Sequence, residues 1–294
     1  MKLSDFTPVS MEDIEEFRRI YRDHPPEHSD YMFSIMMAWS HYMEYRVAWI
    51  GNSMVLLTDL EGKKRLRPPM GKDAMEHLQE VMELARSKEL EHVLSLIGER
   101  TLSDIKEVHP ELKYYSHRDY AEYIYRTSIL ADLPGKRYLK VRNSLNKFRR
   151  ENNYQVEDID GGNIEEVKDF LRRWCIQKGC TEDPFLLMER QATMFSLENI
   201  EEIGLSGTTI RIDDRIQAFA IYEKMREDML VTHFEKANFE IAGLYQAINN
   251  EVALLHRDRY EFINRESDMG VPGLRKAKLK YGPDHMLEVF HARI

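Results

Sequence analysis

Residues 206–237 read SGTTIRIDDRIQAFAIYEKMREDMLVTHFEKA, and this stretch decides the fold class. Three runs rich in β-branched and aromatic residues are separated by the pairs Asp213–Asp214 and Glu227–Asp228. Such runs, bounded by turn residues, predict three antiparallel strands in a meander. Amphipathic helical patterns at 163–179, 183–200 and 241–258 flank the meander, so we expect a sheet covered by helices.

The N-terminal half has the same order of elements. Helices are expected at 10–21 and 31–40, followed by a second meander at 42–71 and a helix at 72–90. Helices, meander, helix and strand is the order of an acetyltransferase-like (GNAT) domain. The sequence therefore predicts an α/β (α+β) protein with tandem GNAT-like (acyl-CoA N-acyltransferase-like) domains, whose mixed central sheets are flanked by helices. We expect the domains to be residues 1–133 and 134–294, because Pro134 and Gly135 break regular structure.

Composition excludes several classes of protein. The 294 residues include 43% hydrophobic and 32% charged residues, which is typical of a folded globular chain. A membrane-spanning helix needs roughly 20 apolar residues, and we expect no transmembrane segment, no signal peptide and a cytoplasmic location. The two cysteines, Cys175 and Cys180, are expected to be ordinary thiols, and no cluster of metal ligands is expected.

The net charge of −9 argues against general nucleic-acid binding, but positive charge is concentrated locally. Residues 135–150 contain seven Lys or Arg residues and no acid. The apolar residues at Tyr138, Val141, Leu145 and Phe148 predict a helix with one buried stripe and a cationic outer face. This cationic face could bind a phosphate-bearing ligand, or it could be a solvated surface that binds no ligand. We give the two interpretations equal weight.

Residues 263–283, INRESDMGVPGLRKAKLKYGP, predict a strand, a tight turn and a short basic helix. Asn264 and Asp268 fall at the end of the strand, where ligands commonly bind in open α/β sheets. Pro272 suits the first turn of the helix, and Arg275 and Lys278 are three residues apart, so both can face one ligand. The spacing of these residues does not decide between two interpretations, a ligand pocket and a structural loop followed by a solvated basic helix.

The run VTHFEKAN (231–238) supplies a candidate base. In a regular strand His233 and Glu235 lie on one side and Lys236 on the other. Glu235 could orient an attacking amine or hydroxyl, or accept its proton. His233 is given less weight, because histidines in sheets are more often satisfied core residues.

Together these stretches, with YIYRTSILADLPGKRYLKVRNSLNKF (123–148) and GLYQAINNEVA (243–253), resemble one family. They are similar to the soluble C-terminal domain of phosphatidylglycerol lysyltransferases (lysylphosphatidylglycerol synthases), and more closely to its stand-alone cytoplasmic relatives. The resemblance is strong over roughly the last 170 residues. It implies a tandem GNAT-like fold and transfer of an aminoacyl group from aminoacyl-tRNA.

We therefore predict an aminoacyltransferase-like enzyme that moves an aminoacyl group from aminoacyl-tRNA to a hydroxyl or amine, with no required cofactor. tRNA and a small-molecule, peptide or lipid acceptor are the expected partners. An acetyl-CoA-dependent N-acyltransferase and a non-catalytic module for an anionic or amino-acid ligand are the alternatives. The predicted catalytic residues are Glu235, Asn264 and Asp268. The predicted substrate-binding residues are Arg275, Lys278, Tyr281, Lys136, Arg137, Lys140, Arg142, Asn143, Lys147 and Lys236.

Overall fold

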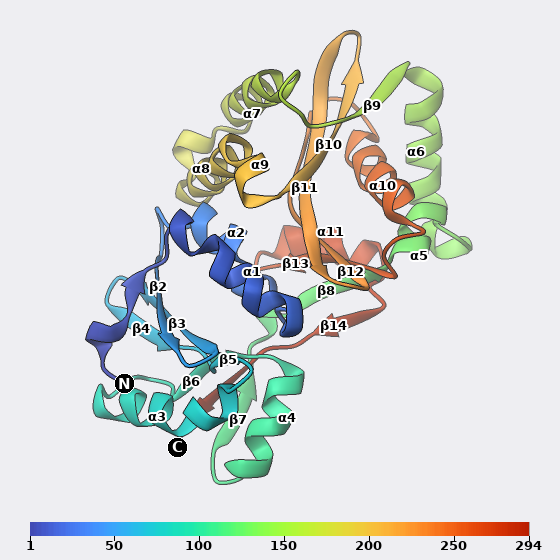
Figure 1. Ribbon diagram of the computed structural model, residues 1–294. Helices are drawn as coiled ribbons and strands as arrows, with labels where there is room; N and C mark the ends of the chain where they lie inside the picture. The colour runs from blue at the N-terminus through green and yellow to red at the C-terminus, as the bar shows by residue number, and fades with distance from the viewer. Residues whose placement is uncertain (294) are drawn as a thin grey trace. The chain divides into compact units, whose positions relative to one another are not determined.

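The computed structural model describes residues 1–293, which form two compact units (Figure 1). Unit 1 comprises Met1–Glu122, Ser267–Gly270 and the C-terminal residues from Met286 onward. Unit 2 comprises Tyr123–Glu266 and Val271–His285. The units are not contiguous segments, so they do not coincide with the expected division between residues 133 and 134.

Unit 1 has two sheets. The first is β1 (Thr7–Pro8), β2 (Glu44–Ile50), β3 (Ser53–Leu60) and β4 (Lys63–Leu66) in spatial order, with β5 (Met70–Gly71) also paired to β3. The second has the order β6 (Leu94–Ile97), β15 (Phe290–Arg293), β7 (Lys113–Ser116). Its helices are α1 (Ile14–Asp23), α2 (Phe33–Ala38), α3 (Ala74–Ser87) and α4 (Glu99–Val108).

The core of unit 1 forms because its helices are amphipathic. Leu78, Val81 and Met82 of α3 are 0–1% exposed and belong to one cluster with Val55 and Leu57 of β3. Burying such side chains contributes on the order of 1.5–3 kcal/mol each. The meander expected at 42–71 is confirmed, since β2, β3 and β4 are antiparallel neighbours.

The strands of unit 2 belong to a seven-stranded sheet with the order β14-β8-β13-β12-β11-β10-β9, in which only His285 of the edge strand β14 is part of unit 2. These strands are β14 (His285–Leu287), β8 (Glu122–Arg126), β13 (Phe262–Ser267), β12 (Met229–Ala237), β11 (Arg215–Arg226), β10 (Ser206–Ile212) and β9 (Tyr154–Asp158). The meander predicted at 206–237 is β10, β11 and β12, and both of its pairings are antiparallel. The β12–β13 pairing is parallel, which makes the sheet mixed.

Each unit contains a strand from the other half of the chain. β8 follows the strands of unit 1 in sequence, yet it lies between β14 and β13 in the sheet of unit 2. β15, the last strand, lies between β6 and β7 in unit 1. The two C-terminal strands β14 and β15 are close in sequence but belong to different sheets.

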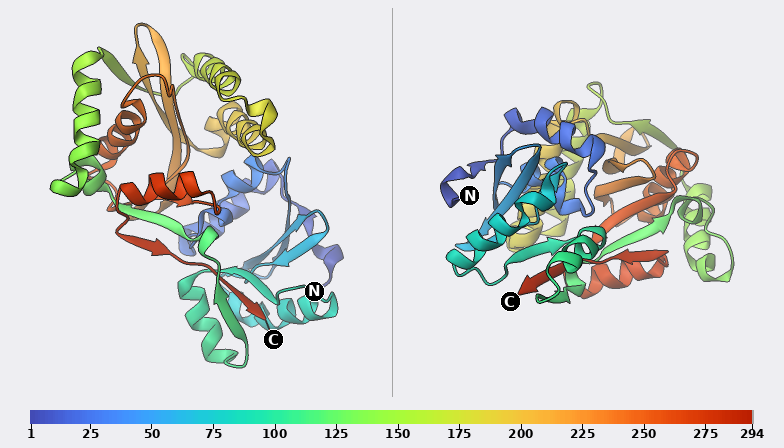
Figure 2. Two further views of the ribbon diagram at one scale, coloured as in Figure 1. Left: turned by 180° about the vertical axis from the view of Figure 1, so that it is seen from behind. Right: turned by 60° about the horizontal axis from the view of Figure 1, so that its bottom comes forward.

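Helices cover both faces of the unit 2 sheet (Figures 1 and 2). α7 (Ile164–Lys178), α8 (Pro184–Glu198) and the short α9 (Ile200–Ile203) lie on one face, and Phe170 of α7 meets Phe219 of β11 edge-on. α5 (Thr127–Asp132), α6 (Leu139–Glu151) and α10 (Leu244–His256) lie on the other, where His256 packs on Tyr222. We call these the α7 face and the α10 face. α11 (Pro272–Lys280) completes the unit.

Two local expectations need correction. The first helix begins at Ile14 rather than Ser10, because residues 11–13 form a 3-10 turn in which the Ser10 amide donates to the Asp13 carboxylate (2.8 Å). Cys175, near the end of α7, and Cys180 are joined in a disulfide, so the expectation of two thiols was wrong. A left-handed Gly179 (φ +67°) ends α7 and turns the chain back toward it.

Candidate functional site

The candidate site lies where β12 and β13 stop pairing in unit 2. Their parallel register covers only Met229–Val231 and Phe262–Asn264, although both strands continue beyond it. β12 also has a bulge there, since Ile221 of β11 pairs with Phe234 while Tyr222 pairs with Thr232. His233 is the extra residue. Bulges are common next to active sites because they redirect side chains and interrupt pairing.

The bulge changes which side chains share a face. Lys236 lies opposite Phe219 and Glu235 opposite Ala220, so Lys236 is on the α7 face and Glu235 is on the α10 face. His233 contacts Glu223 of β11. Glu223 is four residues from Phe219, so both point to the α7 face, and His233 lies on that face too. The expectation that His233 and Glu235 share a side was therefore wrong, because the extra residue shifts the alternation by one.

On the α10 face, Glu235 is held by a buried arginine that we did not single out from the sequence. Arg265 of β13 donates to Glu235 Oε1 at 3.0 Å, and both side chains are about one-seventh exposed (15% and 13%). With its amide oxygen turned toward the guanidinium, Asn249 of α10 accepts from Arg265 Nε (3.2 Å) and Nη1 (3.0 Å). Burial disfavours the charged guanidinium, but Glu235 outweighs this effect, and the pKa of Arg265 is raised.

On the α7 face, His233 lies between two carboxylates. Its Nδ1 is 2.7 Å from Glu266 Oε1 of β13, and its Nε2 is 2.8 Å from Glu223 Oε1 of β11. The ring is 1% exposed. Burial disfavours its charged form, but the hydrogen bonds to Glu223 and Glu266 prevail and raise the pKa of His233 to about 10.

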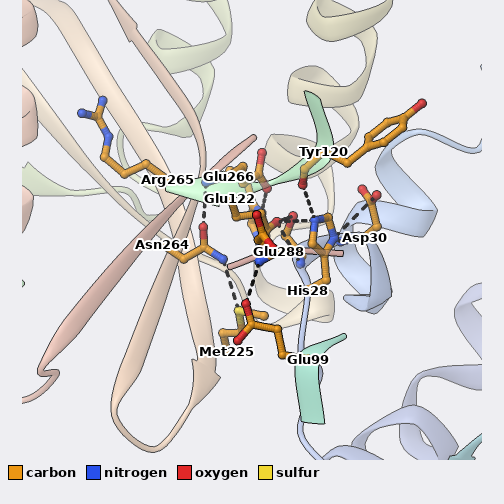
Figure 3. A network of polar contacts seen from close by, with 12 residues as sticks. His28, Asp30, Glu99, Tyr120, Glu122, Met225, Asn264, Arg265, Glu266 and Glu288 are labelled. Carbon is orange, nitrogen blue, oxygen red and sulfur yellow. Dashed lines mark hydrogen bonds and ion pairs between the residues drawn. The ribbon is translucent and has the colours of Figure 1, made fainter. Parts of the chain in front are cut away.

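The side chains of Asn264 and Lys278 hold the end of β13 by hydrogen bonds to its backbone. Figure 3 shows Asn264. Asn264 is fully buried; its Oδ1 accepts from the Glu266 amide (2.7 Å), and its Nδ2 is 3.6 Å from the sulfur of Met225. Lys278 of α11 is 8% exposed, and its Nζ donates to the carbonyls of Arg265 and Glu266 (3.1 Å for Glu266). The sequence places both residues near a site, and their predicted direct roles stay predictions.

Asp268 belongs to unit 1 and is described with it. It is fully buried, accepts from the Gly270 amide at 2.9 Å and pairs with Arg118 at 3.3 Å. Gly270 is left-handed (φ +76°), and a Cβ on it would come within 3.0 Å of the Asp119 carboxyl group. The glycine thus allows the backbone to approach the Asp119 side chain closely. The predicted catalytic role of Asp268 stays a prediction.

The expected basic helix is α11, and Pro272 occupies its first turn as predicted. Arg275 is half-buried, whereas Lys276 and Lys280 are exposed. Tyr281 is 8% exposed and stacks under the Arg265 guanidinium at 5.4 Å, and burial raises the pKa of its phenol to about 12. Tyr281 therefore adjoins the Glu235–Arg265 pair.

The predicted basic helix is α6, with a preceding 3-10 turn at Lys136–Tyr138. Its buried stripe of Tyr138, Val141, Leu145 and Phe148 is confirmed. The exposed polar residues predicted to bind substrate are Lys136, Arg137, Lys140, Asn143 and Lys147. Lys147 is 3.9 Å from Glu151, an exposed pair that leaves most of the positive charge uncompensated.

Two predicted substrate-binding cations have internal partners. Arg142 donates to the carbonyls of Leu133 and Gly135 (2.7 Å for Gly135), so it holds the loop before α6. Lys236 is 4% exposed, pairs with Glu189 of α8 at 2.6 Å and lies 4.6 Å above the Trp174 ring of α7. Their roles in binding substrate stay predictions.

From the sequence we did not single out Arg265, Asn249 or Glu223. The available signal was polar residues in runs that are otherwise apolar: Arg265 and Glu266 follow Asn264 in β13, and Asn249 stands in the apolar run of α10. The partners of these residues come from other elements, so spacing along the chain does not reveal the pairs.

Gly243 is the residue that directly precedes α10. Gly243 is left-handed (φ +89°), and a Cβ there would come within 2.7 Å of the Ser144 carbonyl and 2.9 Å of the Phe148 Cβ. The glycine is thus explained by close packing on α6.

Among residues 1–293, no group of three or more His, Cys, Asp or Glu side chains is arranged to hold a metal ion. Within the same range, no helix has the length and apolar character needed to cross a membrane. Unit 1 has a cavity of about 470 Å³ between the starts of α3 and α4, and none of the predicted site residues lines it.

Comparisons with known proteins agree with this architecture. Residues 21–293 match the family described as phosphatidylglycerol lysyltransferase, C-terminal. A conserved protein of unknown function from Bacteroides thetaiotaomicron is 29% identical, with a TM-score of 0.89 over 98% of each chain. The C-terminal domain of a putative lysylphosphatidylglycerol synthetase from Agrobacterium fabrum is 14% identical, with a TM-score of 0.68 over 96% of this chain and 92% of that one.

An uncharacterized protein of Mycoplasmoides gallisepticum is 22% identical over 183 residues, which span 60% of this chain and 58% of that protein. The predicted fold class, tandem GNAT-like α/β with mixed sheets flanked by helices, is confirmed. Family and fold support an acyltransferase-like activity. The match over nearly the whole chain shows that it belongs to the phosphatidylglycerol lysyltransferase C-terminal family.

Proposed function

We propose that this protein transfers an aminoacyl group from aminoacyl-tRNA to a hydroxyl or amine acceptor in the cytoplasm. The observation that carries the proposal is the Glu235–Arg265 pair at the bulged, unpaired end of β12 and β13. A carboxylate there is fixed by a buried guanidinium, so its position does not depend on the substrate. The family description supports the aminoacyl donor.

The chemistry needs a proton acceptor and no covalent enzyme intermediate. The acceptor O–H or N–H group attacks the ester carbonyl of the aminoacyl-tRNA while its proton passes to Glu235. The bond to the ribose oxygen then breaks, and that oxygen takes up a proton. Arg265 binds Oε1 of Glu235 and the amide of Asn249 lies 3.4 Å from Oε2, and we assign Oε2 as the atom that accepts the proton.

Binding of the donor is assigned to the outer face of α6. Its exposed cations, with Lys136 and Arg137 just before it, form a basic surface on a chain of net charge −9. Each lysine that contacts a phosphate adds about one unit to the dependence of log affinity on log salt concentration. The affinity for tRNA should therefore fall as salt rises.

The first experiment is a titration of the purified protein with aminoacyl-tRNA and, separately, with acetyl-CoA, at two salt concentrations. Salt-sensitive tRNA binding without coenzyme A binding supports the proposal. Lys140→Glu should weaken tRNA binding, whereas Arg172→Glu, on the exposed side of α7, is the charge-matched control. Saturable coenzyme A binding without tRNA binding would make the chain an acetyl-CoA-dependent acyltransferase instead.

The role of Glu235 is tested by transfer of label from aminoacyl-tRNA to phosphatidylglycerol vesicles and to small amines. Glu235→Gln should lower the transfer rate by about 10²–10⁴-fold and leave tRNA affinity unchanged, because general-base catalysis contributes on that order. Equal transfer by the wild type and the variant would show that Glu235 is not the proton acceptor. tRNA binding with no turnover on any acceptor would favour a binding module.

A further inference from the structure

We propose that His233, as an imidazolium, is a positioning residue: it clamps Glu266 and so fixes the neighbouring Arg265 against Glu235. The proposal rests on the proposed function only for its effect on transfer. Its structural part concerns the open end of β12 and β13 and is tested without substrate.

The charge of His233 follows from its partners. Both ring nitrogens face carboxylate oxygens, at 2.7 Å (Glu266) and 2.8 Å (Glu223). An ionised carboxylate only accepts hydrogen bonds, so each nitrogen must carry a proton to satisfy both contacts. The ring is 1% exposed, and water cannot replace either partner at little cost. The charged groups around the ring are Glu223 from β11 and Glu266 from β13, and Lys278 of α11 lies behind the Glu266 carbonyl.

Glu266 is the residue that needs a clamp. Its backbone is left-handed (φ +57°), which is uncommon for a residue other than glycine. Such a conformation costs of order 1–3 kcal/mol, and it persists only where several surrounding interactions hold the residue in place. Here Asn264 accepts from its amide, Lys278 donates to its carbonyl, and His233 binds its carboxylate.

The clamp acts where backbone pairing is absent. The β12–β13 register ends at Val231 and Asn264, and beyond it side chains connect the two strands. The His233–Glu266 bridge lies on the α7 face, and the Glu235–Arg265 bridge lies on the α10 face. In Figure 3 the Arg265 side chain points away from Asn264 and Glu266. Because Arg265 and Glu266 are consecutive, a shift of Glu266 moves the Arg265 backbone and with it the guanidinium.

The sequence-predicted residues gain a different role in this arrangement. Asn264 and Lys278 hold the backbone of β13, and Lys278 also binds the Arg265 carbonyl. They act through Arg265 and Glu235 rather than by touching the reacting atoms. Preorganisation of this kind matters because a displacement of about 1 Å at a catalytic group can cost on the order of 10²-fold in rate.

Glu223 and Glu266 offer a matched pair of variants. Each contributes one carboxylate to the same histidine, so Glu223→Ala and Glu266→Ala remove the same charge from it. Only Glu266 is part of β13 and adjacent to Arg265. If His233 had only a general structural role, the two variants would affect Arg265 exchange and the transfer rate equally. If His233 clamps Glu266, only Glu266→Ala should have a large effect.

The experiment uses the full chain labelled with ¹⁵N in histidine and arginine side chains, with the signals of residues 233 and 265 assigned from His233→Gln and Arg265→Lys. We expect both ring nitrogens of His233 to carry protons at pH 7.5. The Arg265 Nε–H should exchange with water about tenfold faster in Glu266→Ala and less than about twofold faster in Glu223→Ala, as expected for loss of one local constraint.

A neutral His233 ring at pH 7.5, or equal Arg265 exchange in the two variants, would overturn the clamp. In the transfer assay, Glu266→Ala should lower the rate about tenfold or more at saturating donor, with Glu223→Ala close to wild type. If the wild type transfers nothing while the exchange rates differ as expected, the proposed function fails and the clamp stands. If transfer occurs and the two variants transfer equally, positioning by His233 is wrong while the proposed function stands.

Discussion

Two histidine side chains are buried, one in each unit, and their surroundings favour opposite protonation states. His233 in unit 2 lies between two carboxylates, with both nitrogens engaged, and its pKa is raised to about 10. His291 in unit 1 is 3% exposed, and neither ring nitrogen has a hydrogen-bond partner among residues 1–293. Burial, the neighbouring His92 and the cation Arg65 lower the pKa of His291 to about 4. One ring is a structural cation, and the other is an apolar filler.

Their surroundings explain the difference. His291 on β15 packs against His92 (ring centroids 4.8 Å apart), Tyr115 (5.7 Å) and His117 (6.2 Å). Arg293 pairs with Glu91 and approaches His92 Nε2 at 3.3 Å, so positive charge surrounds the cluster. A buried polar group without partners costs stability, and a charged one costs far more. We therefore expect the His233 ring to stabilise unit 2 and the unpaired ring nitrogens of His291 to destabilise unit 1.

The largest expected effect comes from removing the paired ring. His233→Leu leaves two part-buried carboxylates facing an apolar side chain, and loss of one partner from a buried ion pair costs about 3–5 kcal/mol. Denaturant unfolding at pH 7 measures the change in free energy. A loss below about 1 kcal/mol would mean that the Glu223–His233–Glu266 contacts contribute little and that the comparison with His291 is unfounded.

The pH dependence separates the two rings next. The folded pKa of His291 (about 4) is below the ordinary value of 6.5, so its contribution is complete above pH 6.5 and is lost as pH falls toward 4. The loss is on the order of 3–4 kcal/mol, at about 1.4 kcal/mol per pKa unit. The folded pKa of His233 is raised, so its contribution is complete below pH 6.5 and is lost as pH rises through about 10.

Thermal unfolding from pH 4 to pH 10 measures both slopes, and the variants assign them. His291→Phe should flatten the acidic side and leave the alkaline side unchanged. Glu266→Ala should reduce the alkaline slope. If His291→Phe retains the full acidic slope, another group accounts for it.

A smaller effect is expected from replacing the unpartnered ring at neutral pH. His291→Phe substitutes an apolar ring of similar shape for a side chain with two unsatisfied nitrogens, so unfolding at pH 7 should require about 1 kcal/mol more free energy. The measurement is the denaturant midpoint at constant slope. A marked loss of stability would show that the His291 nitrogens have a partner, such as bound water.

The smallest effect is expected at the edge of the cluster. Glu91 and Arg293 are 64% and 48% exposed, and exposed pairs contribute about 0–1 kcal/mol. Glu91→Gln should therefore change stability by less than about 0.5 kcal/mol at pH 7. Burial lowers the pKa of His92 and Glu91 partly opposes this effect, so the variant should lower that pKa further. Histidine NMR titration checks the pKa, with His233 as the internal control that should not move.

The sequence by itself determined the elements and the cationic helix. The meanders at 42–71 and 206–237, the buried stripe of α6 and Pro272 at the start of α11 follow from local patterns, because strand alternation, helical periodicity and backbone restrictions act over a few residues. Glu235 was also selected from such a pattern, the strand run at 231–238, and its catalytic role stays a prediction.

Only the tertiary structure decided which residues meet. The bulge at His233 depends on how β12 pairs with β11, and it placed Glu235 and His233 on opposite faces, against the expected alternation. Arg265 and Glu235 are 30 residues apart, and β8 and β15 each join a sheet of the other half of the chain. Such pairings are set by burial and hydrogen bonding between distant segments, and no local pattern encodes them.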